Sequence, residues 1–471
     1  MPVVPGSLDS LLFLLAGAFS TPSFQTFRCL VVGFLSRIGE HTVCGMLQAA
    51  RLERVWHHSR AHDFFAVREW SPDRLGLLLL DFLCATFVGR EAAICLAVDD
   101  TLFRRTGKKV HGASWQYDGS LPSGSGNQLG FGNNWVVLAL LLRLPFLRRA
   151  IALPVLFRLW LPEPRANGEA GVRRQANPDH PSKSELARGL LDLVIVRYPN
   201  RKISLVGDSA YGSKALRGLP GRVTVTSRLR SNARLYAPKP PRTGKRGQPA
   251  KKGVRPASLK TIAQDAATAW KETEVTRGAR CQIALCDAFD ALWYDVWRER
   301  PVRVLLVKSP NCKTAYDIAL ISTDMNASPA EIIERYDERW AIEVSFEDAK
   351  QITGVGEARN RVQRAVERTV PFGLLCQTLT TAWYTLCGRA EHDVQHRRHH
   401  APWYRQKTNP SYHDMLASLR RAIIAAQYSP VTPATPNQQE NTKPAHPLKL
   451  AAAYYPGKVI PDMIFRPRRR R

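Results

Sequence analysis

A tyrosine, an arginine, two glutamates and a lysine share one predicted helix. A capping box at 328–331, with proline at the first helical position, predicts that this helix begins there and runs to about Ile352. At 100° per residue, five polar side chains fall in one narrow stripe about four turns long: Tyr336, Arg339, Glu343, Glu347 and Lys350. Carboxylates and cations in this arrangement are suited to a divalent ion and to phosphates.

Apolar residues flank this stripe on both sides. Trp340 and Val344 lie on one flank, and Ile342, Phe346 and Ala349 on the other. We therefore expect the stripe to lie in a cleft within the core, where a carboxylate must meet a cation or a metal ion. The alternative is a ladder of salt bridges on an exposed helix, which does not explain the flanking Trp340 and Phe346.

Three more acidic residues follow apolar runs that have the character of buried strands. Asp99 and Asp100 close the run at 92–98, and Asp208 closes the run at 203–206. Aspartates at strand ends often cap turns, but they also reach the crevice where ligands bind. Because neighbouring strand residues point to opposite faces, only one of Asp99 and Asp100 can join a site with Asp208 and the helix. Together these carboxylates offer the several oxygen ligands that Mg²⁺ prefers.

The spacing of the helical stripe resembles a known signature. The stripe contains the pattern Tyr336-x2-Arg339-x3-Glu343-x6-Lys350. This pattern matches, in all four residues and their spacings, the Tyr-Arg-Glu-Lys signature of a large group of bacterial insertion-sequence DDE transposases. The segments at 97–101 (AVDDT) and 206–212 (VGDSAYG) resemble the strands that bear the first and second catalytic aspartates of that family. The resemblance covers roughly residues 90 to 370.

The resemblance implies a fold and a set of metal ligands. The fold would be α/β, with a ribonuclease H-like core and a mixed sheet, interrupted by a β-rich insertion and flanked by helical N- and C-terminal regions. Asp100, Asp208 and Glu343 would be the catalytic residues and would bind two Mg²⁺ ions, for which Mn²⁺ can substitute. Asp100 is preferred over Asp99 because the family's aspartate commonly precedes threonine. Glu347, one turn beyond Glu343, is the main rival for the third ligand.

The implied reaction is DNA-end cleavage followed by strand transfer. Two ions held by three carboxylates would activate water and stabilise the leaving 3′ oxygen, and the freed 3′-hydroxyl would then attack target DNA. Tyr336, Arg339 and Lys350 would contact the terminal phosphates, and Tyr336 is not expected to be a nucleophile. Two alternatives are a metal-dependent nuclease without strand transfer and a non-catalytic, domesticated DNA-binding protein. The segment 107–109 lacks a phosphate-loop frame, so no nucleotide cofactor is expected.

The charge of the chain independently favours a polyanionic partner. Its 471 residues contain 68 Lys and Arg against 40 Asp and Glu, a net charge of +28. Nucleic acid is the leading partner, and an anionic membrane is second. Residues 231–260 hold nine Lys and Arg, no acid and five prolines, which predicts a flexible arm that contacts DNA phosphates. We expect four of its cations to bind DNA: Lys245, Arg246, Lys251 and Lys252.

The pattern of elements predicts six regions. Residues 1–90 form a helical DNA-binding region, either a helix-turn-helix around 24–52 or an ordinary bundle. The others are the first part of the catalytic core (91–229), the insertion (230–325), the second part of the core with the glutamate helix (326–370), a helical C-terminal region (371–430) and a disordered basic tail (431–471).

The remaining features favour a cytoplasmic protein, and the resemblance implies that it is bacterial and associated with the nucleoid. The nine cysteines form no Cys-x-x-Cys pair, and arginines interrupt the most apolar stretch, at 135–162. His392 and His396 have zinc-ligand spacing, but the neighbouring Arg397 and Arg398 favour a basic DNA-facing surface. Because two DNA ends must be brought together, we expect a homodimer in the DNA-bound complex.

Overall fold

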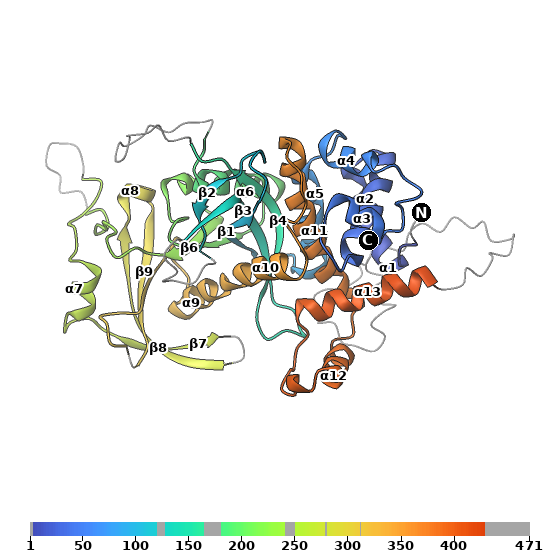
Figure 1. Cartoon of the computed structure of the whole chain (residues 1–471). Coiled ribbons are helices and arrows are strands. Elements are labelled where there is room, and N and C mark those ends of the chain that lie inside the picture. The colour runs from blue at the N-terminus through green and yellow to red at the C-terminus, as the bar shows by residue number, and fades with distance from the viewer. Residues whose placement is uncertain are drawn as a thin grey trace, which may run out of the picture.

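One mixed sheet with helices packed around it organises the chain (Figure 1). The computed structural model describes residues 3–119, 128–163, 180–240, 250–277, 280–310 and 312–428. Within them the architecture is mixed α/β, consistent with the ribonuclease H-like fold that the resemblance implies. No helix among these residues has both the length and the apolar character needed to cross a membrane.

The sheet has ten strands in the described part of the chain. They are β1 (Ile94–Arg104), β2 (Ser114–Tyr117), β3 (Leu129–Leu142), β4 (Ile151–Trp160), β5 (Ile203–Gly207), β6 (Val223–Arg228), β7 (Lys271–Arg277), β8 (Arg280–Leu292), β9 (Pro301–Lys308) and β10 (Ile318–Ser322). Their order is β2-β3-β1-β5-β6-β10-β9-β8-β7, and β4 also pairs with β3, along the edge that faces away from β1. The central strand β1 is antiparallel to β3 and parallel to β5.

The predicted end of the first strand is wrong. The apolar run stops at Asp99, but the strand does not, because β1 continues through both aspartates to Arg104. The neighbouring β3 offers backbone partners to both aspartates, which pair with Val137 and Val136. Both carboxylates therefore lie inside a strand in the middle of the sheet. Asp208, by contrast, directly follows β5, as the sequence predicts.

The helices gather in two places. Those that pack on the sheet are α6 (Lys183–Arg197), α9 (Pro329–Glu338) and α10 (Trp340–Gln351). A larger helical body, which also contacts β4, contains α1 (Gly6–Phe13), α2 (Thr21–Ser36), α3 (Val43–Ala49), α4 (Ser59–Ala66), α5 (Pro72–Phe87), α11 (Gln363–Cys387) and α13 (Tyr412–Tyr428). The remaining helices are α7 (Leu259–Gln264), α8 (Tyr294–Trp297), α12 (Ala390–His400) and the short turns η1 (Ala16–Ala18), η2 (Lys214–Leu216) and η3 (Pro402–Tyr404).

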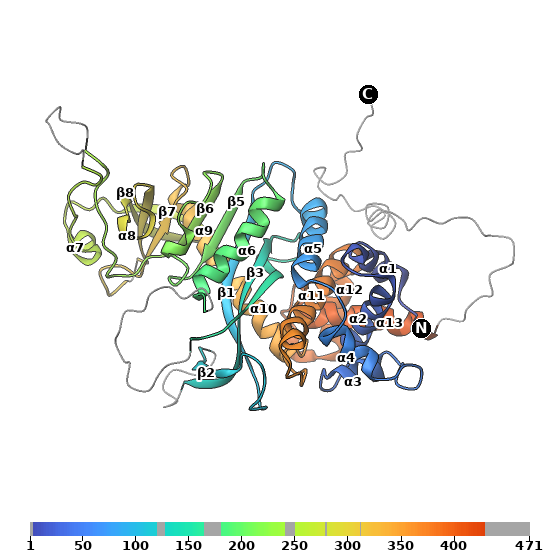
Figure 2. The ribbon, with the colours of Figure 1, turned by 90° about the horizontal axis from the view of Figure 1, so that it is seen from above.

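Residues from both ends of the described chain share one helical core. The ring of Phe372 on α11 lies edge-on to the rings of Phe27, Phe64 and Phe65, with centroids 5.3–6.3 Å apart. Figure 2 shows α11 beside the N-terminal helices. Most of α2 is buried, and Cys44 and Gln48 are the exposed residues of α3. α2 and α3 therefore pack against each other and against the rest of the helical body.

The basic arm is only partly as predicted. Its described ends pack, because Leu235 and Leu259 are buried, and Gly253 donates a backbone hydrogen bond to Ala237. The ammonium of Lys252 lies 3.7 Å from the centroid of the Tyr236 ring. Apolar residues thus anchor both ends of the arm to the molecule. The prediction of a flexible arm rested on charged residues and prolines and did not take these apolar residues into account. Lys245 and Arg246, like the tail at 431–471, lie outside the described residues.

Candidate active site

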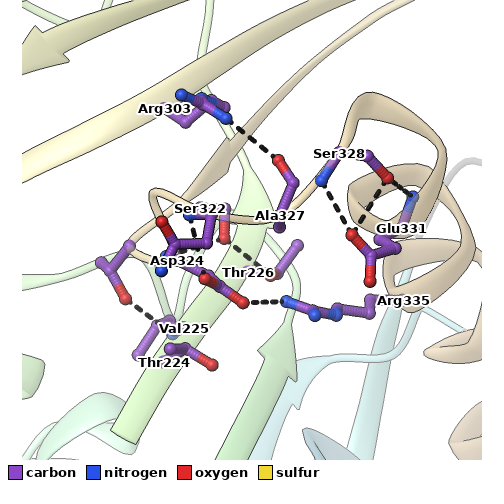
Figure 3. Close-up of polar contacts among 12 residues, drawn as sticks. Thr224, Val225, Thr226, Arg303, Ser322, Asp324, Ala327, Ser328, Glu331 and Arg335 are labelled. Carbon is purple, nitrogen blue, oxygen red and sulfur yellow. Dashed lines mark hydrogen bonds and ion pairs between the residues drawn. The ribbon is translucent and has the colours of Figure 1, made fainter. Parts of the chain in front are cut away.

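The start of the helix that carries the polar stripe is fixed by hydrogen bonds (Figure 3). The Ser328 hydroxyl accepts the Glu331 N–H, and the Glu331 carboxylate accepts the Ser328 N–H at 2.8 Å, which is the predicted capping box. Arg335, one turn on, donates to Asp324 at 2.7 Å. Asp324 lies two residues after β10, so these contacts hold the start of the helix to the end of that strand.

The predicted single helix is divided at Arg339. α9 ends at Glu338 and α10 begins at Trp340, although Arg339 keeps helical dihedral angles of φ −52° and ψ −35°. The Arg339 N–H bonds to the Tyr336 carbonyl, one residue closer than in an α-helix. The interruption is therefore a local tightening, and Glu343 remains one turn beyond Arg339.

Arg339 joins the helix to the central strand. One of its amino groups lies 2.9 Å from an Asp99 oxygen, and the other lies 2.6 Å from a Glu343 oxygen. The Arg339 and Asp99 side chains are only 12% and 16% exposed. The Arg339 Nε is buried and has no hydrogen-bond partner among the described residues. A single guanidinium thus holds two carboxylates, one from the sheet and one from the helix.

Burial raises the pKa of Asp99 to about 7, although Arg339 acts in the opposite direction. Its second oxygen accepts the Asp100 N–H at 2.8 Å. The nearby charges of Asp100 and Asp208 raise the Asp99 pKa further. Three carboxyl groups therefore lie within electrostatic range of one another at this point of the sheet.

Asp100 points to the other face of the sheet, towards α6. The ammonium of Lys183 lies 2.5 Å from one of its oxygens, and the Tyr211 hydroxyl donates to the other at 3.2 Å. Lys183 follows the cap residue Ser182 directly, so the start of α6 places it over the strand. Lys183 and Tyr211 belong to the site, but sequence reasoning did not identify them.

Asp208 lies beside this cluster. It follows β5, and its carboxylate accepts the Ala210 N–H at 2.8 Å, which forms the turn that presents Tyr211. The pKa of Tyr211 lies well above its usual value, first because of burial and then because of Asp100, Asp99 and Asp208. The Tyr211 hydroxyl therefore contacts Asp100 and follows the Asp208 turn, whereas Arg339 joins Glu343 to Asp99, on the opposite face of β1 from Asp100.

The other residues of the signature line the same helix. The Arg339 guanidinium lies 5.5 Å from the centre of the Tyr336 ring, and burial raises the Tyr336 pKa. Lys350 lies 5.6 Å from the centre of the Phe103 ring, and burial lowers its pKa. Glu347 is exposed and accepts a hydrogen bond from Gln351, so it does not reach the aspartates in this structure.

The predicted cleft is partly wrong. Trp340 is 56% exposed and Val344 is also exposed, whereas Ile342, Phe346 and Ala349 are buried. Only one flank of the stripe packs on the molecule, because α10 contacts the sheet and α11 from a single side. The stripe therefore lies at the boundary between core and solvent, which leaves its polar groups accessible to a large ligand.

The donor chemistry of the site suits a hard divalent ion, since all candidate ligands are carboxylate oxygens. In this structure Lys183 and Arg339 occupy oxygens of Asp100 and Glu343. No group of three His, Cys, Asp or Glu side chains in the described ranges is close enough to hold one metal ion, and this includes the histidines of α12. Metal binding would therefore require these ion pairs to open.

Asp348, on the buried side of α10, predicts a pH effect on stability. Burial, followed by the charge of Glu347, raises its pKa from 3.8 to about 7. The native state therefore keeps a proton that the unfolded chain loses, and stability falls as the pH rises from about 4 to 7. Replacing Asp348→Asn should remove roughly 2 kcal/mol of this fall. Urea unfolding from pH 4 to 8 tests this, and parallel stability curves for variant and wild type would contradict it.

Comparison with known proteins agrees with this geometry. Residues 15–282 match the family model of the DDE superfamily endonuclease, which is more than half of the chain. The matched region includes β1 and β5 with their aspartates and ends before the glutamate helix. No curated protein matches the chain. The chain belongs to the DDE superfamily endonuclease family.

Proposed function

We propose that the protein is a DDE transposase that cleaves the ends of an insertion sequence and transfers them to target DNA. Family membership assigns a nuclease or transposase type of activity on DNA. The observation that carries the finer proposal is the contact of Arg339 with Asp99 and Glu343. It supports a site in which the Tyr-Arg-Glu-Lys helix works with the aspartates of the central strands.

Three carboxylates are proposed as the metal ligands. DDE superfamily endonucleases generally use divalent ions such as Mg²⁺, and we assign two ions to Asp100, Asp208 and Glu343, with Mn²⁺ as a substitute. When bound, such ions supply positive charge to the attacking and leaving oxygens of a phosphodiester. Asp99 is then assigned as the structural partner of Arg339, whose guanidinium donates to one of its oxygens at 2.9 Å.

The cations of the helix are proposed to bind the DNA backbone. Tyr336, Arg339 and Lys350 would contact the phosphates next to the scissile bond, and Arg339 would exchange its carboxylate partners for a phosphate. A guanidinium fork matches phosphate as well as carboxylate, so this exchange keeps its hydrogen bonds. Lys350 and Arg339 would lower the negative charge that develops at phosphorus.

The remaining assignments follow from the reaction. The DNA-bound form is proposed to be a homodimer, because two ends must be joined to one target. The N-terminal helices would bind transposon ends, and the protein would act in the bacterial nucleoid. Lys245, Arg246, Lys251 and Lys252 of the basic arm would contact DNA phosphates, and the excess of positive charge supports this role.

The test is a reaction of the purified protein with DNA that carries the ends of its element, with Mg²⁺ or Mn²⁺. Products covalently joined to a target plasmid would support transposition. Nicks without joined products would support the nuclease alternative. DNA binding without either product would support a domesticated binding protein and overturn the proposal.

The arm predicts a change in the salt dependence of binding. Replacing Lys251 and Lys252 by Gln should make the slope of log K against log[salt] shallower by about 2, because two phosphate contacts would be lost. Fluorescence anisotropy with duplex DNA measures the slope. The titrations run from roughly 50 to 300 mM NaCl, the range over which such slopes are resolved. An unchanged slope would remove Lys251 and Lys252 from the DNA interface.

A further inference from the structure

The ribbon formed by β2 and the start of β3 has its polarity reversed. Trp115 and Tyr117 are 70% and 65% exposed, whereas Gln116 and Asp118, which alternate with them, are buried. An ordinary surface strand buries its apolar side chains and exposes its polar ones. The ribbon therefore presents its aromatic side chains to solvent and buries its polar ones.

Packing on the inner side prevents the ribbon from turning over. The buried Asp118 carboxylate pairs with Arg104 at 2.9 Å. A Cβ atom on Gly130, opposite Gln116, would lie 2.8 Å from the Leu102 side chain and 3.0 Å from an Asp118 oxygen. Only a residue without a side chain allows this close approach. The inner face is thus committed to a hydrogen-bonded contact, and Trp115 and Tyr117 are held outward.

The outward side chains are mostly aromatic and lie side by side on one face of the ribbon. Trp115 pairs with Phe131 across the ribbon, and their ring centroids are 5.7 Å apart. Tyr117 pairs with Leu129, which is also exposed. We call these four residues the aromatic ribbon. Figure 2 shows β2 at the margin of the molecule. Grouped exposed aromatic side chains of this kind mark an interaction surface.

The strand register places the aromatic ribbon on the face of the sheet that carries Asp99. Asp99 pairs with Val137, and residues 137, 135, 133 and 131 of β3 alternate onto the same face. Phe131 is six residues from Val137, about 20 Å along the strand. Phe103, whose ring contacts Lys350, pairs with Asn133 between these two points. A line from Asp99 therefore passes Phe103, which contacts Lys350, and reaches the aromatic ribbon.

The charges around this line favour DNA as the occupant. Lys108 and Lys109 are exposed in the loop before β2. The Arg361 side chain is exposed, and the Arg361 carbonyl accepts the His111 N–H at 2.9 Å. This hydrogen bond holds Arg361 next to the loop before β2. The described residues around the ribbon thus combine aromatic rings with cations. This is the composition of surfaces that bind unpaired strands, with bases stacked on rings and phosphates on cations.

We propose that the aromatic ribbon is a stacking surface for unpaired nucleobases of the DNA strand that lies in the active site. The inference rests on the proposed function and adds a substrate preference to it: DNA with a short single-stranded segment about 20 Å from the scissile phosphate. Trp115 and Phe131 supply the flat rings, and Lys350 guides the backbone between the carboxylates and the ribbon.

The experiment measures binding without metal, in EDTA, so that it does not depend on cleavage. Two fluorescent DNA probes have the same duplex sequence. One of them is blunt, and the other has a single-stranded extension of about six nucleotides with 2-aminopurine at its centre. Wild type should bind the extended probe at least tenfold more tightly and quench its 2-aminopurine. Trp115→Ala should reduce this preference by about five- to tenfold and relieve the quenching, while binding of the blunt duplex stays within about twofold.

Two variants control for structure. Trp115→Phe keeps a ring and should retain most of the preference. Trp403→Ala removes a tryptophan that is 78% exposed on η3, outside the ribbon, and should leave the preference unchanged. No preference in wild type, or equal losses for Trp115→Ala and Trp403→Ala, would overturn the proposal. A concentration-dependent dimer lost in Trp115→Ala, with unchanged probe preference, would assign the ribbon to self-association instead.

The outcome is independent of the proposed transposition. A protein that binds the extended probe through Trp115 but joins no DNA would retain the stacking surface and lose the transposase assignment. A protein that cleaves and joins DNA with no role for Trp115 would retain the assignment and lose the stacking surface.

Discussion

Replacing Glu343→Gln should lower the rate of DNA-end cleavage by at least about 10³-fold, because the amide removes a charged oxygen ligand from the site. Asp208→Asn is expected to cause a loss of the same size. Glu347→Gln should stay within about threefold of wild type, since its exposed side chain contacts Gln351 and not the aspartates. The measurement is single-turnover cleavage of labelled DNA ends with saturating Mg²⁺.

Glu347 provides a matched control for Glu343. Both lie on α10, one turn apart, and both change to an amide of the same size. A large loss for Glu347→Gln with near-normal activity for Glu343→Gln would transfer the ligand role to Glu347. DNA binding in EDTA should stay within about threefold for both variants, which separates a lost ligand from a lost interface.

Replacing Arg339→Met should lower the free energy of unfolding by about 3–5 kcal/mol. The change leaves Asp99 buried and without its cation, and it also removes the link between β1 and Glu343. Breaking a buried pair from one side costs more than the pair itself contributes, because one charge remains desolvated. Urea unfolding followed by circular dichroism measures the effect.

A double variant separates the buried charge from the lost packing. Asp99→Asn combined with Arg339→Met should recover about half or more of the lost stability, since neither partner then carries a charge. Arg359→Met is the matched surface control, because the Arg359–Glu40 pair is 75% and 65% exposed. That variant should change stability by less than about 1 kcal/mol. Equal losses for Arg339→Met and Arg359→Met would contradict a structural role for the Asp99 contact.

The local parts of the site were predictable because they depend on short stretches of chain. The capping box at Ser328 forms as predicted, since its hydrogen bonds join residues three apart. The helical spacing of Arg339 and Glu343 follows from 3.6 residues per turn, and their side chains do meet. Asp208 ends a short apolar run, and the structure places it directly after β5.

The long-range parts needed the fold. Sequence alone could not show that β1 continues through Asp99 and Asp100, because that depends on pairing with β3 about forty residues later. Nor could it show which flank of α10 is solvent: Trp340 is exposed because the helix packs from one side only.

Two opposite faces of one strand explain the division of roles. The sequence predicts that only one of two adjacent aspartates can serve the site, because strand side chains alternate. The tertiary structure decided their partners: Arg339 from the helix after β10 reaches Asp99, and Lys183 from the helix after β4 reaches Asp100. Neither cation is near its partner along the chain, so only the packing of helices on both faces of the sheet brings them together.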